Sequence, residues 1–203
     1  GDRFDIKVFH NHVLANGATS SGTLLMSNGF LSVSGNLTVG NSGRGDLLMM
    51  NGTGVISSTL SVGINSGSVG VVTLAGPGAD LSIGGATLGA AVASRGILYL
   101  SNGIMRTKGQ VKWGDNGDSL VVLAGGSLIC TDNVPTANAQ LNFPFGAGTS
   151  RLVIASAEST LTQYGNNGGL LVPAGVGGYG DIIQSNGTLI AAEVALGAAV
   201  GSE

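Results

Sequence analysis

The stretch LTVGNSGRGDLLMMNGTGVISS, residues 37–58, alternates short apolar runs with turns that contain glycine. Its first element, Leu37 to Gly40, has the form apolar-x-apolar-glycine, and this form returns at residues 60–63, 86–89 and 111–114. The closing glycines stand 23, 26 and 25 positions apart. Self-similarity at a period of this length is typical of repeat proteins, in which each repeat is one structural unit.

Two further elements recur within each period. The second element is an apolar run that closes in Asn-Gly or Gly-Gly, and it occupies residues 22–29, 45–52, 96–103, 118–126 and 180–187. The third is a short apolar run after that turn, at residues 30–33, 80–83, 127–130 and 188–191. Residues 151–164 look like one more copy of both elements with a degraded turn. The unit is therefore three short strands separated by three turns in about 24 residues.

This unit predicts an all-β fold, a single-stranded parallel β-solenoid (β-helix) of about seven rungs. Short strands at 8–12-residue spacing could also form a sandwich or a barrel. A sandwich, however, needs no equivalence between every third strand, whereas a solenoid requires it because equivalent positions stack on one another. Within each strand the flanking aliphatics are expected to point inward and the middle Ser or Thr outward. The predicted core includes Leu37, Val39, Leu60, Val62, Leu81, Ile83 and Leu88.

The repeat divides the chain into a body and two ends. The solenoid body is expected at residues 20–192, with excursions at 131–149 and 165–180, where the pattern breaks. Residues 1–19 are expected to form an N-terminal strand, a cap or an inter-subunit connector. Residues 193–203 are expected to form a C-terminal cap or tail.

Composition excludes several classes of protein. Glycine accounts for 37 of 203 residues, only 9% of residues are charged and the net charge is −3. Low charge argues against disorder, and glycine without a strict triplet excludes collagen. There is no basic footprint for a nucleic acid, and no apolar run approaches the ~20 residues of a membrane span. The low lysine content with many Ser, Thr, Asn and Gly residues is the style of secreted proteins, so an extracellular or cell-surface location is expected.

The pattern L-x-V-G-N-x-G-x-G-x-L-x-[IM]-x-x-G runs from Leu37 to Gly52. It resembles the glycine-rich β-helix repeats of autotransporter passenger domains and related secreted bacterial surface proteins. The resemblance covers residues 20–130 and, more faintly, 150–192. It implies a parallel β-helix, and it leaves function open because that family hosts adhesins, enzymes and inert stalks alike.

Few residues suggest chemistry. Arg44-Gly45-Asp46 matches an adhesion tripeptide, but Gly45 occupies a repeat position, so it is interpreted as a corner glycine of the scaffold with two solvent-exposed neighbours. His10 and His12 could begin a metal site, yet no third ligand is evident. Cys130 is interpreted as a buried apolar residue. Arg106, Lys108 and Lys112 could form a small basic patch (residues 106–112). No catalytic residue, no metal site and no cofactor is expected, and the chain is predicted not to be an enzyme.

Asparagine recurs at one corner of the repeat. Asn28, Asn51, Asn102 and Asn186 occupy equivalent positions and are predicted to form a ladder along the solenoid. Three sequons begin at Asn36, Asn51 and Asn186. Because two of them use the predicted ladder, Asn36 is the expected acceptor if the protein is glycosylated.

Phe4, Ile6 and Val8 alternate with polar residues and predict a strand with one apolar face. Such a strand could add to its own end rung or to that of a neighbour, so self-association through the termini is expected. The leading functional hypothesis is a secreted, non-enzymatic structural or adhesive β-solenoid at a cell surface, including the subunit of an extracellular fibre. The alternative is a carbohydrate-binding or carbohydrate-cleaving β-helix whose site lies beside residues 131–149. A cell-surface or polysaccharide partner is expected, with neither nucleic acid nor a membrane span.

Overall fold

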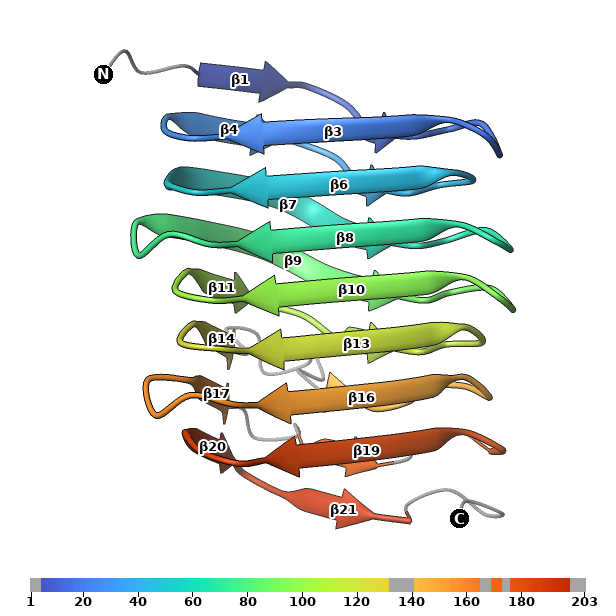
Figure 1. The fold of residues 1–203 in the computed structure, drawn as a ribbon, viewed down its shortest axis with the longest axis vertical. Helices are drawn as coiled ribbons and strands as arrows, with labels where there is room; N and C mark the ends of the chain where they lie inside the picture. The colour runs from blue at the N-terminus through green and yellow to red at the C-terminus, as the bar shows by residue number, and fades with distance from the viewer. Residues whose placement is uncertain (1–4, 132–140, 165–168, 173–175, 198–203) are drawn as a thin grey trace.

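The computed structural model confirms the predicted β-solenoid, and Figure 1 shows its turns stacked along one axis. The structure describes residues 5–131, 141–164, 169–172 and 176–197. All strand pairs among them are parallel and in register, apart from one shift in β7 (Gly52–Val62). Each turn contributes one strand to each of three faces, as the three-strand repeat predicts.

The second element of the repeat forms a seven-stranded sheet, drawn toward the viewer in Figure 1. Its strands are β3 (Ser21–Met26), β6 (Arg44–Met49), β8 (Val69–Leu74), β10 (Arg95–Leu100), β13 (Asp118–Leu123), β16 (Thr149–Ile154) and β19 (Tyr179–Gln184). They are stacked in sequence order.

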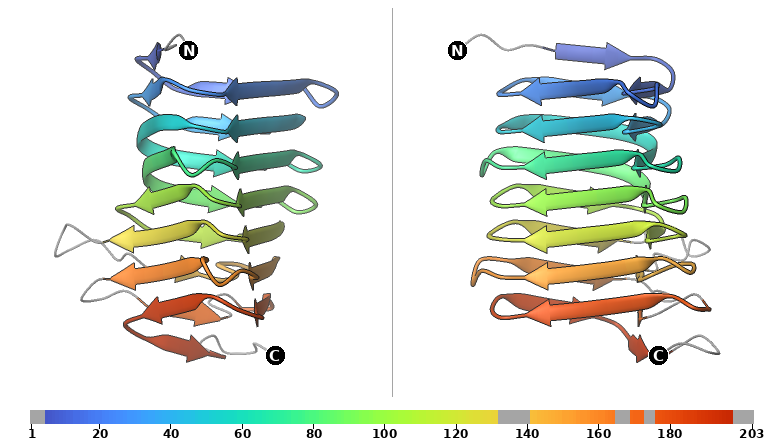
Figure 2. Two further views of the ribbon diagram at one scale, coloured as in Figure 1. Left: turned by 60° about the vertical axis from the view of Figure 1, so that its left-hand side comes forward. Right: turned by 45° about the vertical axis from the view of Figure 1, so that its right-hand side comes forward.

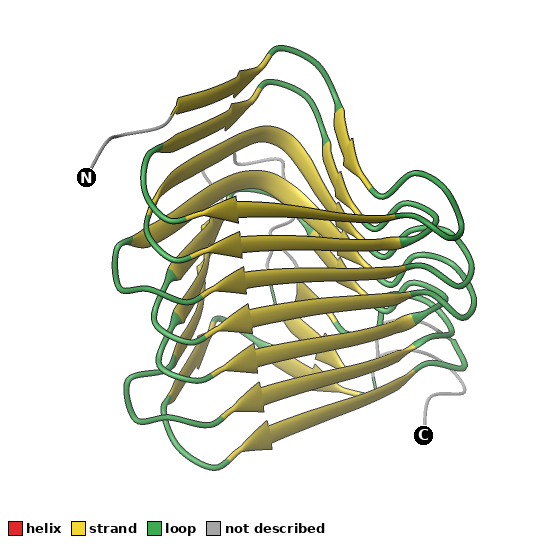
Figure 3. Cartoon of the chain, turned by 45° about the horizontal axis from the view of Figure 1, so that its top comes forward, coloured by secondary structure: helices red, strands yellow, loops and turns green. Residues whose placement is uncertain are grey.

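The other two elements form the two halves of a fourteen-stranded sheet. One half holds β1 (Asp5–Val8), β4 (Phe30–Val33), β11 (Ile104–Thr107), β14 (Ser127–Thr131), β17 (Thr160–Tyr164) and β20 (Thr188–Ala191). The other holds β2 (His12–Leu14), β5 (Leu37–Val39), β12 (Val111–Trp113), β15 (Leu141–Asn142), β18 (Leu170–Val172) and β21 (Val194–Leu196). The long strands β7 and β9 (Ala79–Leu88) run through both halves, and Figure 3 shows them curving across the bend.

The core is a continuous column of stacked aliphatic side chains. All seven predicted core residues are buried, from Leu37 to Leu88. Lower in the column Trp113 occupies the position that Val39, Val62 and Leu88 hold in earlier turns. The Trp113 ring meets the Phe143 ring edge to face, with centroids 5.0 Å apart. The inward side chains of each turn are buried because the neighbouring turns cover them.

Glycine is required at the corner that ends each apolar-x-apolar-glycine element. Gly40, Gly63, Gly89 and Gly114 all have positive φ, between 61° and 73°. A Cβ on Gly63 would lie 2.2 Å from the carbonyl oxygen of Arg95 in a following turn. The corner therefore needs both the conformational freedom and the small size of glycine.

The two ends of the chain and both predicted excursions contain strands that pair with the solenoid, although the sequence repeat is not recognisable there. Strands β1 and β2 pair in register with β4 and β5, and β21 pairs with β18. The predicted excursion at 131–149 contains β15, and that at 165–180 contains β18. Residues 132–140, 165–168 and 173–175 of these excursions lie outside the described part of the chain.

Candidate functional site

A groove lies on the bend between the two halves of the fourteen-stranded sheet. It has a volume of about 470 Å³ and is lined by Ser58, Thr59, Gly84, Gly85, Ala86, Thr87, Gln110 and Lys112. A smaller groove of about 200 Å³ shares Gly84 and is lined also by Ser57, Ser82 and Lys108. Because Gly84 and Gly85 carry no side chain, they contribute only backbone to the lining. Hydroxyl groups and lysine stems therefore surround a floor of bare backbone.

The three residues of the predicted basic patch do not form one cluster of contacts. The guanidinium of Arg106 is paired with the carboxylate of Asp80 on the neighbouring strand. Lys108 and Lys112 instead line the two grooves on the bend. The ammonium of Lys112 also lies 4.1 Å from the centre of the Phe145 ring, a distance at which a cation–π attraction operates. This part of the surface is suited to a hydroxylated or anionic ligand.

A glycosidase needs two carboxyl groups about 5 to 9.5 Å apart. Neither groove on the bend is lined by a carboxylate. A third groove of about 310 Å³ is lined by one acid, Asp118, together with Arg95 and Arg151. These three grooves lack the acid pair, so none of them has the arrangement of a carbohydrate-cleaving site.

The Arg-Gly-Asp tripeptide lies inside β6, so the prediction that Gly45 stands at a corner is wrong. Arg44 donates hydrogen bonds from Nε and Nη2 to the two carboxylate oxygens of Asp46, at 3.0 and 2.9 Å. Gly45 is buried, and a Cβ there would lie 2.1 Å from the nitrogen of Gly40. The two charged groups thus neutralise each other on a flat sheet, and the glycine serves packing.

A second ion pair joins β16 to β19. Arg151 donates to Asp181 Oδ2 from Nη2 at 2.8 Å and from Nε at 3.3 Å. The hydrogen bond from Arg151, and then that from Tyr179, holds the pKa of Asp181 below its usual range. The same contact with Asp181 raises the pKa of the Tyr179 hydroxyl. The sequence did not indicate this pair because its two members are 30 residues apart.

The predicted corner asparagines form local bonds. Asn28, Asn51 and Asn186 each accept a hydrogen bond at Oδ1 from the next residue's backbone N–H, which is a glycine in every case. Asn102 Nδ2 donates to the carbonyl of Ala75, 27 residues earlier, at 3.4 Å. These four hydrogen bonds therefore stabilise the turns, and that of Asn102 also reaches another turn.

A different set of asparagines does connect the turns. Asn41 Nδ2 donates to Asn16 Oδ1 at 2.6 Å, and Asn65 Nδ2 donates to Asn41 Oδ1 at 3.2 Å. The signal was present in the sequence as asparagines at positions 16, 41 and 65, one or two positions after the corner residues Ala15, Gly40 and Gly63.

Asn36, the expected glycosylation site, also takes part in contacts between turns. Its backbone N–H donates to Asn11 Oδ1, and its own Oδ1 accepts from the N–H of Thr59. The side chain is half-buried. A glycan on Nδ2 would have to leave the Thr59 bond in place.

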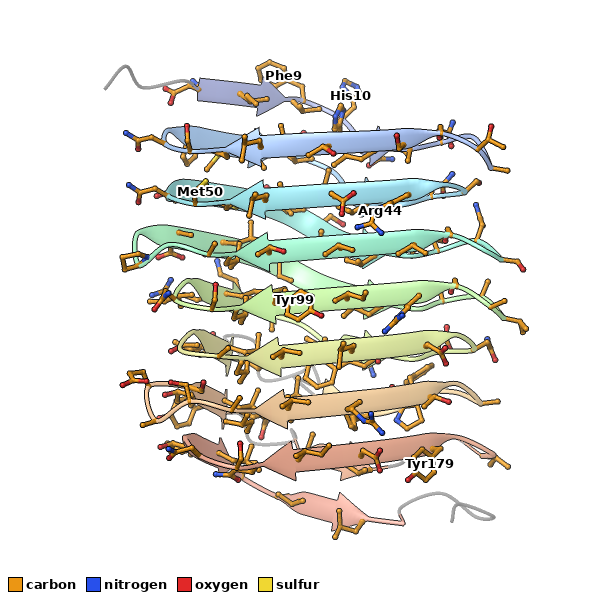
Figure 4. All side chains as sticks on the ribbon, viewed as in Figure 1. Phe9, His10, Arg44, Met50, Tyr99 and Tyr179 are labelled. Carbon is orange, nitrogen blue, oxygen red and sulfur yellow. The ribbon has the colours of Figure 1, made fainter. Side chains whose placement is uncertain are left out.

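Two of the three residues predicted for assembly, Ile6 and Val8, lie in the first turn. Ile6 and Val8 pack partly buried against the core, opposite Leu31 and Val33 of β4. Phe4 lies outside the described residues. Phe9 is 77% exposed beside the exposed His10, and Figure 4 shows both at the N-terminal end.

Other predicted positions hold no site. In the described part of the chain, no three His, Cys, Asp or Glu residues lie close enough to hold a metal ion. Cys130 is fully buried, and burial raises the pKa of its thiol far above the usual range, so it packs as an apolar residue. Nor does any helix of the described ranges have the length and hydrophobicity to cross a membrane.

Comparison of the chain with protein families, with curated proteins and with solved structures finds no match.

Proposed function

We propose that the protein is a non-enzymatic structural or adhesive β-solenoid of a cell surface, and that it associates end to end into longer rods. The observation that carries this proposal is the state of the two end turns. Among the described residues, β1, β2 and β3 at one end each pair with a strand on one side only, as do β19, β20 and β21 at the other. Figure 2 shows these strands at the top and bottom of the stack.

Each end also leaves part of the core uncovered. At the N-terminal end Ile6, Val8 and Leu24 are only partly buried, and at the C-terminal end Ile182, Leu189 and Ala191 are only partly buried. Free backbone groups beside an uncovered apolar core are a template for another strand. Joining the first turn of one copy to the last turn of another is a heterologous contact, which propagates into a filament unless it closes.

The body of the molecule supports a structural role. Its turns are held by a continuous core and by glycine corners that admit no side chain. The three grooves described above lack paired carboxylates. A secreted scaffold needs regular faces, and the stacked strands of this body form them.

End-to-end association is tested by placing a charge in the uncovered core. Leu189→Lys puts an ammonium on the inward side of β20, and Ile190→Lys puts the same group on the outward side of the same strand. Because an inward-pointing charge blocks strand addition, Leu189→Lys should shorten the rods seen by electron microscopy to single solenoids. Ile190→Lys should leave rod length unchanged. Rods of equal length in both variants would contradict the proposal.

A second candidate function, carbohydrate binding, is favoured by the grooves on the bend. The larger one falls in the usual volume range of ligand sites, and Lys108 and Lys112 supply positive charge to the pair of grooves. The ligand suited to them is an acidic polysaccharide, with hydroxyls for the serine and threonine side chains and carboxylates for the lysines.

Affinity electrophoresis in gels that contain polygalacturonate tests this candidate. Lys108→Ala with Lys112→Ala should abolish retardation, whereas Lys7→Ala on β1 removes one positive charge elsewhere and should not. Equal retardation of the parent and the double variant would show that the grooves do not bind this polymer.

A further inference from the structure

The outward side of the seven-stranded sheet carries an unusual number of apolar side chains. We call it the aliphatic face and define it as the outward residues of β3, β6, β8, β10, β13, β16 and β19. One column runs along it from Leu25 through Tyr99 to Ile183, and its polar groups are the hydroxyls of Thr73 and Tyr99. Leu25 is 58% exposed, Tyr99 38% and Ile183 45%. Exposed apolar patches of this extent mark interaction sites.

The middle column of the face has an apolar centre and charged ends. Val71, Ile97 and Leu120 lie side by side on the three central strands. Asp46 precedes them on β6 and Arg151 follows them on β16. By contrast, the corresponding column of the other sheet holds Thr38, Ser61, Thr87 and Lys112.

We propose that the aliphatic face is a dimer interface between two copies of this chain, related by a two-fold axis that passes through Ile97 and runs along the strands. Such an axis keeps each column opposite itself and reverses the order of the turns. Ile97 then meets Ile97 of the second copy, and Val71 meets Leu120. Asp46 meets Arg151, with opposite charges facing each other at both ends.

Charge favours a second copy over other partners. The face carries three arginines, Arg44, Arg95 and Arg151, and three aspartates, Asp46, Asp118 and Asp181. A balanced face attracts neither a polyanion nor an anionic lipid surface, but it is complementary to itself under the proposed axis. The ion pairs Arg44–Asp46 and Arg151–Asp181 of the two copies meet as a four-membered network.

The axis also brings the two Arg95 side chains close together. On its own sheet Arg95 lies opposite Asp118 of the next strand. In the dimer Asp118 of the second copy lies one strand from Arg95 as well. Two arginines and two aspartates thus alternate around the axis, and the like charges are compensated.

The size of the face suits a stable dimer. Seven strands at ~4.8 Å spacing and six residues at ~3.3 Å give a flat area of roughly 670 Å². A standard interface buries about 800 Å² on each partner, and protruding side chains raise the accessible area above the flat area. Figure 4 shows Arg44, Tyr99 and Tyr179 on this face, whose strands stack as a regular sheet. Flat sheets pack face to face about 10 Å apart.

The first test replaces the residue on the axis. Ile97→Asp places two carboxylates against each other, while Ile129→Asp makes the same change on the outward side of β14, in the other sheet. Both positions are half-buried. By sedimentation equilibrium, Ile97→Asp should weaken the dimer by at least about 100-fold, and Ile129→Asp should leave its Kd unchanged. A monomeric parent, or equal effects of the two changes, would overturn the proposal.

A charge exchange tests the orientation. Asp46→Arg alone should weaken the dimer because it faces Arg151, and Asp46→Arg with Arg151→Asp should restore it. If the double variant is no tighter than the single one, the proposed axis is wrong.

Cross-linking separates this contact from end-to-end association. Ile97→Cys treated with a short bismaleimide should give a covalent dimer on a denaturing gel, even within longer rods. The native thiol of Cys130 is buried and does not compete. Ile129→Cys is the matched control. Failure of Ile97→Cys to cross-link above this control would also overturn the proposal, whether or not rods form.

Discussion

Single glycines decide whether successive turns can close on one another. Gly63 and Gly67 both have positive φ, of 66° and 75°, yet their surroundings differ. A Cβ on Gly63 would meet the backbone of Arg95, whereas a Cβ on Gly67 would have nothing within 4 Å. Ala15 and Ala93 also have positive φ, so an alanine can adopt this conformation where space allows.

Gly63→Ala should therefore destabilise the fold far more than Gly67→Ala. The strained conformation alone costs an alanine about 1 kcal/mol, which is the whole effect expected at Gly67. At Gly63 the clash with backbone should bring the loss to roughly 3 kcal/mol or more. Urea unfolding of the two variants measures the difference, and similar midpoints would show that the corner is not tightly packed.

The same contrast applies to neighbouring side chains of β7. Val62 is buried in the core and Ser61 points outward. Val62→Asp should cost roughly 3 kcal/mol or more because it buries an unpaired charge. Ser61→Asp should change the free energy of unfolding by less than about 0.5 kcal/mol. Thermal melts of both variants check the inward and outward assignment, which equal losses would contradict.

Contacts between elements are made by side chains far apart in the chain. Asn41 bonds to both Asn16 and Asn65, while Asn51 has only a bond to the next residue. We expect Asn41→Ala to cost about 1 kcal/mol, since it breaks two bonds between turns. Asn51→Ala should cost less. Chemical denaturation compares the two variants. A larger loss of stability in Asn51→Ala would show that hydrogen bonds within a corner matter more than those between turns.

The contact of Asp181 with Arg151 predicts a dependence of stability on acid. A carboxyl group whose pKa is lowered in the folded state contributes stability above its unfolded pKa of about 3.9. That contribution is lost as the pH falls through the lower folded value. Unfolding measured from pH 6 to pH 2 should therefore decline less in Asp181→Asn than in the parent. Because the pair is partly exposed, high salt should reduce the difference; identical pH profiles would contradict the prediction.

The whole molecule behaves as a stack of equivalent turns, so a complete turn should be removable. Deleting residues 64–89 joins Gly63 to Ala90 and removes β8 and β9 between two equivalent corners. The shortened chain should keep its sheet content by circular dichroism and unfold at a lower denaturant concentration, since one interface between turns is lost. Deleting residues 64–80 instead joins non-equivalent positions and should abolish folding. Equal behaviour of the two deletions would contradict the modular description.

The sequence by itself determined the solenoid, the content of each turn and the core. The reason is that each turn is specified locally, by a three-strand unit whose alternation and glycine corners repeat every 23 to 26 residues. It also indicated correctly that Cys130 is buried, but it placed Gly45 at a corner, whereas Gly45 is buried within β6. The relationship to secreted surface proteins and the function remain hypotheses that rest on resemblance and geometry.

Only the tertiary structure decided which side chains of different turns meet. The register between turns depends on the lengths of the connections, and these vary; Ser119 and Ser150, which bond to each other at 2.8 Å, are 31 residues apart because the chain between them is longer than one repeat. The bend of β7 and β9, the grooves beside Gly84 and the Arg151–Asp181 pair follow from that register. The columns of the aliphatic face also follow from the register. The sequence of a single strand shows only which side chains alternate inward and outward, and the surface arises when the strands stack.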